Sequence, residues 1–177
     1  MSDSAQLKLL LTGVPGCGKT TVMTRLAKLV GDRRLAGFVT EEILNSGQRT
    51  GFQAKTFRGE EALLSSIHHK SWVSVGGRYG VDVRSFEELV LPELEMDPDT
   101  VDLFLVDEIG KMECVCPGFV ESMQRVLELN VPLIATVSQQ GKGFVRDIKN
   151  RPDVQIITVT ADNREQLPQT LLDRLPS

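Results

Sequence analysis

Aromatic residues and excess positive charge are both scarce in this chain of 177 residues. It contains one Trp, one Tyr and seven Phe, so aromatic side chains make up 5% of the sequence. Its 20 Lys and Arg stand against 24 Asp and Glu, which gives a formal net charge of -4. A protein that binds the nucleic-acid backbone needs the opposite sign, because Lys and Arg neutralise the phosphates. We therefore expect no direct nucleic-acid binding.

Long apolar runs and paired cysteines are also missing. No stretch approaches the ~20 consecutive apolar residues of a membrane-spanning helix, and the first six residues lack the basic and apolar regions of a signal peptide. The three cysteines, Cys17, Cys114 and Cys116, are odd in number and define no disulfide framework. Reduced thiols are typical of the cytoplasm. We expect a cytoplasmic, monomeric protein with no membrane segment.

The composition is that of one globular domain, which we assign to residues 1–177. Hydrophobic residues make up 41% of the chain and charged residues 25%. Four short apolar runs, residues 7–12, 101–106, 131–136 and 154–159, are typical of buried parallel strands. Helix-length segments separate them, and right-handed crossovers then give a mainly parallel sheet. We predict a three-layer α/β fold.

Two of those segments have clear helical periodicity. Before Gly31, one face of the first helix collects Val22, Leu26, Leu29 and Val30. The segment 119–129 places Phe119, Met123, Val126 and Leu127 on one face. The acidic stretch 87–102 predicts a helix followed by a surface loop.

Residues 37–83 depart from the alternation of strands and helices. Segments 37–44 and 51–57 flank the turn-rich tetrapeptide Asn45-Ser46-Gly47-Gln48. This pattern predicts an antiparallel hairpin inserted into the domain.

A glycine-rich motif lies between the first predicted strand and the first predicted helix. Residues 13–20 match G-x-x-x-x-G-K-[ST] at every defined position. Successive N–H groups of such a loop point inward, and the helix adds its positive dipole end to the same anion site. The residues we expect to bind the phosphates of a nucleotide are Gly13, Val14, Pro15, Gly16, Cys17, Gly18, Lys19, Thr20 and Thr21.

Three side chains of this loop have distinct expected roles. Lys19 would reach the β- and γ-phosphates and so take part in catalysis. The Thr20 hydroxyl would contact Mg²⁺ bridging those phosphates, and Thr21 would contact the α-phosphate. We interpret Cys17 as a small residue that fits the loop.

Asp107 and Glu108 follow the apolar run 103–106. A carboxylate at the carboxyl end of a buried strand is placed to hold magnesium, which we assign to Asp107, with Glu41 or Glu42 as the next candidates. Glu108 would orient or deprotonate a water molecule for in-line attack. The pair favours hydrolysis over transfer to a bound hydroxyl.

Four segments together resemble one known family. They are residues 13–21, 37–42 (Gly-Phe-Val-Thr-Glu-Glu), 106–113 (Val-Asp-Glu-Ile-Gly-Lys-Met-Glu) and 151–154 (Arg-Pro-Asp-Val). They are similar to the small P-loop nucleoside-triphosphatases that include the vertebrate cancer-related nucleoside-triphosphatase. The resemblance implies a P-loop core and magnesium-dependent hydrolysis of ATP, GTP and other triphosphates to diphosphates, with loose base preference. It also implies a nucleotide-side position for Leu103, Phe104, Leu105, Val106, Asp107, Glu108, Ile109 and Gly110.

Two further segments are weaker candidates. Residues 138–151 are basic and could close over the phosphates as a lid, with Arg146 or Arg151 acting on the developing charge; a solvated helix face is the alternative. Asn163 and Arg164, in a loop after the last strand, could contact the base or could cap a helix.

Two other functions stay open. A nucleoside-monophosphate or small-molecule kinase would need a second pocket, which the hairpin residues Thr40, Glu41, Glu42, Arg49 and Lys55 could form. A nucleotide-binding interaction module would turn over hardly at all, and Glu108 argues against it.

Overall fold

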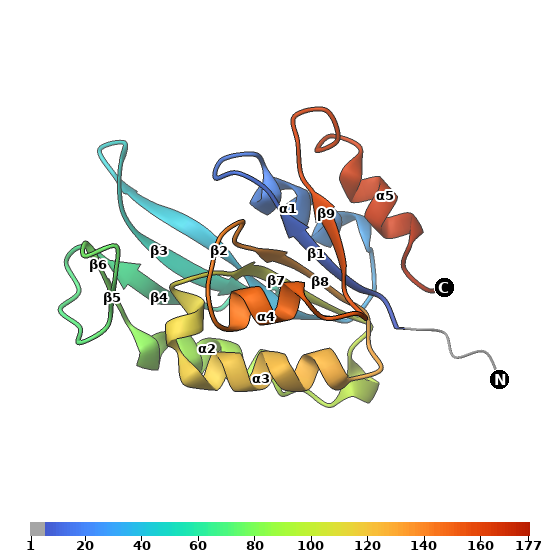
Figure 1. Cartoon of the computed structure of the whole chain (residues 1–177). Coiled ribbons are helices and arrows are strands. Elements are labelled where there is room, and N and C mark those ends of the chain that lie inside the picture. Colours follow the sequence, from blue (N-terminus) through green and yellow to red (C-terminus); the bar gives the residue numbers. More distant parts are fainter. Residues whose placement is uncertain (1–5) are drawn as a thin grey trace.

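A nine-stranded sheet runs through residues 6–177, the part of the chain that the computed structural model describes (Figure 1). Its strand order is β5-β6-β4-β3-β2-β7-β8-β1-β9. The strands are β1 (Lys8–Thr12), β2 (Leu35–Asn45), β3 (Gln48–Thr56), β4 (Glu61–Ser66), β5 (Ser74–Val75), β6 (Tyr79–Val81), β7 (Leu103–Ile109), β8 (Leu133–Val137) and β9 (Gln155–Thr158).

Five α-helices are found over the same residues. They are α1 (Lys19–Leu29), α2 (Val83–Leu94), α3 (Pro117–Glu128), α4 (Phe144–Lys149) and α5 (Leu167–Asp173). Single 3-10 turns lie at Pro98–Thr100 and Glu113–Val115. In the described part of the chain, no helix is both long and apolar enough to cross a membrane.

Helices cover both faces of the parallel half of the sheet, formed by β2, β7, β8, β1 and β9. Side chains alternate between the faces, so Leu9 and Leu11 pack with α1 and α5 while Leu10 belongs to the core under α2, α3 and α4. Figure 1 shows these two helical layers on opposite sides of the sheet. The predicted three-layer α/β fold is confirmed.

The expected hairpin is present and belongs to the same sheet. Strand β2 pairs in parallel with β7 through residues 35–38, and its further half pairs antiparallel with β3. The turn lies at Ser46 and Gly47, both with positive φ (49° and 78°), as the tetrapeptide predicted. Strands β4, β6 and β5 extend this antiparallel half. Strand β2 therefore belongs to the parallel half where it begins and to the inserted antiparallel half where it ends.

Several details of the sequence prediction were wrong. Strand β9 lies at an edge of the sheet, and Ile156 is 45% exposed, so β9 is not a buried strand. Leu29 lies off the buried face of α1, which uses Met23 instead. Helix α2 begins at residue 83, where the Asp82 side chain accepts a hydrogen bond from the Ser85 N–H at 3.0 Å.

The topology places the carboxyl ends of three central strands together. Strands β7, β8 and β1 are parallel neighbours, so the segments that follow them emerge at the same end of the sheet. In open α/β sheets, ligands bind outside the carboxyl ends of the strands. The candidate site therefore includes the loop after β1, the acidic end of β7 and the segment after β8.

Candidate active site

The loop after β1 has the conformation of an anion cradle. Gly18, directly before α1, has φ 107° and ψ 18°, a left-handed conformation that favours glycine. A Cβ on Gly13 would lie 2.7 Å from Cys17 Sγ and 2.9 Å from the Val159 carbonyl oxygen, so that position has no room for a side chain. No side chain of the described residues caps α1. Its first N–H groups are left for an anion.

Lys19 lies between this loop and the acidic end of β7. Its Nζ donates to the Gly13 carbonyl oxygen at 3.2 Å and lies 3.9 Å from Oε2 of Glu108. The ammonium group is thus held at the mouth of the loop, where a terminal phosphate would approach.

Asp107 is buried beside the loop, with 1% of the residue exposed. The Thr136 hydroxyl donates to its Oδ1 at 2.5 Å, while Oδ2 has no hydrogen-bond partner among the described residues. Burial raises the pKa of Asp107 to about 6, and the Thr136 and Thr20 hydroxyls oppose that rise. A buried carboxylate oxygen without a partner, next to the Thr20 hydroxyl, fits the oxygen ligands that Mg²⁺ prefers.

Glu108 faces the cavity, with its side chain 32% exposed. Ser138, directly after β8, donates from Oγ to Glu108 Oε1 at 3.1 Å. The carboxylate therefore has one oxygen held by Ser138 and the other directed toward Lys19. Gly110 makes room for this arrangement, because a Cβ there would lie 2.8 Å from Glu108 Oε1 and 3.0 Å from Ser138 Oγ.

Glu113 is a third acidic group of the site, and no role was expected for it from the sequence. It is 5% exposed, and its Oε2 accepts a hydrogen bond from the Gly110 N–H at 3.2 Å. Burial raises its pKa to about 8, helped by repulsion from Glu108 and Asp107. The raised pKa favours the protonated form of Glu113, and the hydrogen bond from Gly110 lets its side chain support the turn after β7. Its presence in the motif 106–113 was the only available signal.

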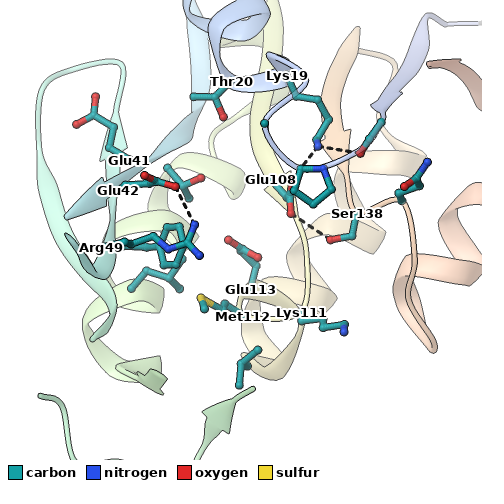
Figure 2. A pocket seen from close by; sticks show the side chains of 18 of the residues that line it. Lys19, Thr20, Glu41, Glu42, Arg49, Glu108, Lys111, Met112, Glu113 and Ser138 are labelled. Carbon is teal, nitrogen blue, oxygen red and sulfur yellow. Dashed lines mark hydrogen bonds and ion pairs between the residues drawn. The ribbon is translucent and has the colours of Figure 1, made fainter. Parts of the chain in front are cut away.

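A cavity of about 920 Å³ is lined by residues of the phosphate loop, Lys19, Glu108 and Glu113, whereas the buried Asp107 is not part of its lining. Figure 2 shows Lys19 on one side, Glu41, Glu42 and Arg49 on the other, and Glu108 and Glu113 between them. Ser138, Gln139 and Gln140 line it after β8. Of the residues expected to bind phosphates, the cavity is lined by Gly13, Pro15, Gly16, Gly18, Lys19, Thr20 and Thr21.

Some of the residues expected at the nucleotide do not line the cavity. The side chains of Leu103, Phe104, Leu105, Val106 and Ile109 are completely buried in the core, so they carry Asp107 and Glu108 to the site but present no surface to a nucleotide. Gly110 is buried too, and Val14 and Cys17 are absent from the cavity lining.

The base-side candidates lie behind the phosphate loop. The Asn163 side chain accepts from the Thr160 N–H at 2.9 Å and donates to the Thr158 carbonyl oxygen at 2.8 Å, so it holds its own loop together. Arg164 packs on the loop, with a guanidinium nitrogen 3.5 Å from the Cys17 carbonyl oxygen. Neither residue lines the cavity.

The two arginines expected in the lid have separate environments. Arg151 binds Asp153 at 2.9 and 2.7 Å and Glu128 at 2.7 Å, close to Lys8 at the start of β1. Parallel strands β1 and β9 begin at this end of the sheet, opposite the phosphate loop. The structure therefore does not support a catalytic role for Arg151. Arg146, in the short helix α4, is exposed and pairs only with its neighbour Asp147 among the described residues.

The fold and this site define a P-loop nucleotide-binding protein. The family model described as NTPase matches residues 8–172. The nucleoside-triphosphatase THEP1 of Thermotoga sp. (strain RQ2) is 37% identical over 169 residues, which cover 96% of this chain and 95% of that protein. The chain belongs to the NTPase family.

Two solved structures share the fold. The crystal structure of THEP1 from the hyperthermophile Aquifex aeolicus superposes with a TM-score of 0.88 at 33% identity, over 97% of this chain and 100% of that one. The solution structure of a human cancer-related nucleoside triphosphatase gives a TM-score of 0.78 at 31% identity, over 94% and 96% of the two chains. The family resemblance stated from the sequence is confirmed.

Proposed function

We propose that the protein hydrolyses nucleoside triphosphates to diphosphate and phosphate, with Mg²⁺ as cofactor and loose base preference. The observation that carries the proposal is the position of Glu108, with Oε2 3.9 Å from Lys19 Nζ and Oε1 hydrogen-bonded to Ser138. The Lys19 ammonium, which we expect to bind phosphate, and the Glu108 carboxylate face the same cavity. A cation on the phosphates and a carboxylate that orients water both assist in-line attack on a γ-phosphate, so this arrangement supports hydrolysis.

The expected step uses three groups of this chain. The loop N–H groups and Lys19 bind the β- and γ-phosphates and balance the charge that develops during transfer. Glu108 orients water and takes its proton as the new oxygen–phosphorus bond forms and the bond to the bridging oxygen breaks. The nucleoside diphosphate leaves with that electron pair.

Thr20 and Asp107 are the residues that would hold magnesium. Among residues 6–177 no three His, Cys, Asp or Glu side chains gather into a metal site, so protein carboxylates alone would not hold the ion. Mg²⁺ usually binds one or two carboxylates together with substrate phosphates. When bound, the ion supplies positive charge to the β- and γ-phosphate oxygens.

The positions of the polar groups in the cavity support the proposed loose base preference. The polar groups we have described around Lys19 and Glu108 serve phosphates and water, and Arg164, which packs on the loop, does not line the cavity. Arg146 remains the candidate lid arginine. A single domain, a cytoplasmic location and a monomeric state also remain predictions.

A phosphate-release panel tests the proposal. ATP, GTP, CTP and UTP are each incubated with the protein, with and without Mg²⁺, and free phosphate and diphosphate are measured. We expect release from all four, within about tenfold of one another, and only with the metal. No phosphate release from any triphosphate, in a protein shown to be folded, would refute the proposed hydrolysis.

A further inference from the structure

The cavity has two chemically different walls. One is the phosphate loop with Lys19; the other comes from β2, β3 and β4 and carries Glu41, Glu42 and Arg49 (Figure 2). Phe52 lines the same wall. Phosphates need N–H donors and cations, which the first wall supplies. Two carboxylates on the second wall would repel a polyphosphate tail. The residues that we assign to the phosphates and to Mg²⁺ therefore leave the second wall without a role.

Arg49 is held in place on this second wall. Its guanidinium lies 2.9 Å from Glu42 Oε1 and donates to the Tyr79 hydroxyl at 3.2 Å, and it sits 5.2 Å from the centre of the Phe52 ring. Its charge is thus already balanced by Glu42, and Glu41 remains as an additional carboxylate. Such a wall favours ligand groups that donate hydrogen bonds, such as hydroxyls, over anionic ones.

Beside these polar groups the second wall is apolar. Phe52, Leu64, Val75 and Met112 line it, and Phe52 is half-buried with its ring edge-on to Tyr79 at 5.7 Å. Because the Arg49 guanidinium lies over the Phe52 ring, a planar ligand ring would pack against the exposed part of this Arg49–Phe52 pair and the aliphatic side chains beside it. The whole cavity, at about 920 Å³, lies near the upper end of the ~300–1,000 Å³ that is usual for small-molecule sites. It has room for a second ligand beside a triphosphate.

We propose that the second wall binds a neutral nucleoside, with its ring against Phe52 and its ribose hydroxyls toward Glu41 and Glu42. This inference rests on the proposed function, because the nucleoside would lie beyond the γ-phosphate, on the Glu108 side. A ribose hydroxyl oxygen then attacks the γ-phosphorus in place of water. Its proton passes to Glu108, the bond from phosphorus to the bridging oxygen breaks, and the products are a nucleoside monophosphate and a nucleoside diphosphate.

Calorimetric titration tests the binding step. Adenosine, guanosine, cytidine and uridine are each titrated into the protein saturated with Mg²⁺ and a non-hydrolysable ATP analogue, which fills the phosphate loop. We expect at least one nucleoside to bind, and its monophosphate to bind more weakly because of Glu41 and Glu42. No binding of any of the four nucleosides overturns the inference, and tighter binding of the monophosphate overturns the charge argument.

The location is tested with Phe52→Leu, which keeps an apolar side chain and removes the ring. Stacking of one base on an aromatic residue corresponds to a loss of at least ~5-fold in affinity when the ring is removed. The matched control is Phe57→Leu, at a half-buried phenylalanine that does not line the cavity. Thermal unfolding establishes that both variants are folded. Equal nucleoside affinity in Phe52→Leu and wild type would place the ligand elsewhere and overturn the inference.

Transfer is measured with ATP labelled at the γ-phosphate. We expect label in the monophosphate of the bound nucleoside, in addition to free phosphate. Label in phosphate alone, with the nucleoside bound, overturns the acceptor role. Hydrolysis without added nucleoside separates the two ideas: if it proceeds while no nucleoside binds, the proposed function stands and only the second site fails.

Discussion

Ser138 donates a hydrogen bond from Oγ to Oε1 of Glu108 at 3.1 Å, from the end of the strand next to β7. The bond leaves Oε2 of Glu108 facing Lys19 at 3.9 Å. Since the serine acts through Glu108, we assign it a positioning role. Its position also explains why Gly110 has no side chain, because a Cβ there would meet both oxygens.

Ser138→Ala should lower kcat by ~2–10-fold, as expected for the loss of one hydrogen bond, and should leave KM almost unchanged. Ser138→Thr, which keeps the hydroxyl, should restore most of the rate. Ser122→Ala is the matched control, because Ser122 Oγ also donates to a glutamate at 3.1 Å, Glu95, outside the cavity. Steady-state kinetics on the three variants checks this. An equal rise in KM with kcat unchanged would mean that Ser138 binds substrate.

Glu108→Gln should bind triphosphate but hardly cleave it. The amide keeps the size of the side chain and its acceptor for Ser138, and it loses the charge that attracts the water proton. General-base assistance contributes on the order of 10²–10⁴ in rate. Single-turnover hydrolysis and equilibrium titration of nucleotide measure the two effects separately. Hydrolysis at the wild-type rate would remove Glu108 from the mechanism, and an equal loss of affinity and turnover would make it a metal-site residue.

Lys19→Ala should lose tight triphosphate binding and hydrolysis together. The ammonium lies between the Gly13 carbonyl and Glu108, where it would balance phosphate charge both before and during transfer. We expect affinity to fall by at least ~10-fold and turnover to become undetectable. The exposed Lys28 in the last turn of α1 provides the control substitution, Lys28→Ala. Unchanged nucleotide affinity in folded Lys19→Ala would contradict the phosphate-loop assignment.

Much of the site could be predicted because local patterns determine it. The phosphate loop is contiguous in sequence, and Asp107 and Glu108 end an apolar run. Because β1 and β7 lie parallel on either side of β8, the loop and the two acids meet at the same end of the sheet. Periodicity also predicted the buried face of α3. These features depend on sequence neighbours and on a general rule of α/β sheets.

The parts that were missed depend on tertiary contacts. Ser138 reaches Glu108 only because β8 lies beside β7, and Glu113 returns to Gly110 only because the chain turns after β7. The segment 138–151 was expected to act as one lid, yet Asp153 and Glu128 hold Arg151 at the end of the sheet opposite the phosphate loop. Local sequence patterns do not reveal interaction partners that lie far away in the chain, such as Glu128 for Arg151.

Asp107→Asn should raise the Mg²⁺ concentration needed for half-maximal hydrolysis by ~10-fold or more. The neutral amide keeps the size of the buried side chain but cannot balance the charge of the ion. Activity measured against Mg²⁺ concentration reports the change directly, and thermal unfolding without nucleotide serves as the folding control. A mutant curve that overlays the wild-type curve would move the metal role to another acid, with Glu41 and Glu42 tested next.

The starts of β2 and β7 are joined by Arg34 and Asp102. Asp102 Oδ2 accepts from the Arg34 backbone N–H at 2.7 Å, its Oδ1 lies 2.7 Å from the Arg34 guanidinium, and the next residues begin the parallel pairing of Leu35 with Leu103. This contact fixes the register that brings Glu41 on β2 and Glu108 on β7 to the same cavity. The Arg34 side chain lowers the pKa of Asp102 to about 2. The carboxylate therefore stabilises the fold above the unfolded pKa of 3.8 and loses that effect as pH falls from 3.8 toward 2.

Asp102→Ala should accordingly lower the free energy of unfolding at pH 7 by about 1 kcal/mol, chiefly through the lost hydrogen bond to the backbone N–H, because an exposed ion pair adds little. Urea unfolding at pH 7, 5 and 3 measures the difference from wild type. That difference should be the same at pH 7 and 5 and smaller at pH 3, where the aspartate is partly protonated in the unfolded chain. Asp162→Ala, at an exposed aspartate after β9, should change stability little at any pH. A difference that stays constant down to pH 3 would show that the charge of Asp102 does not hold the two strands together.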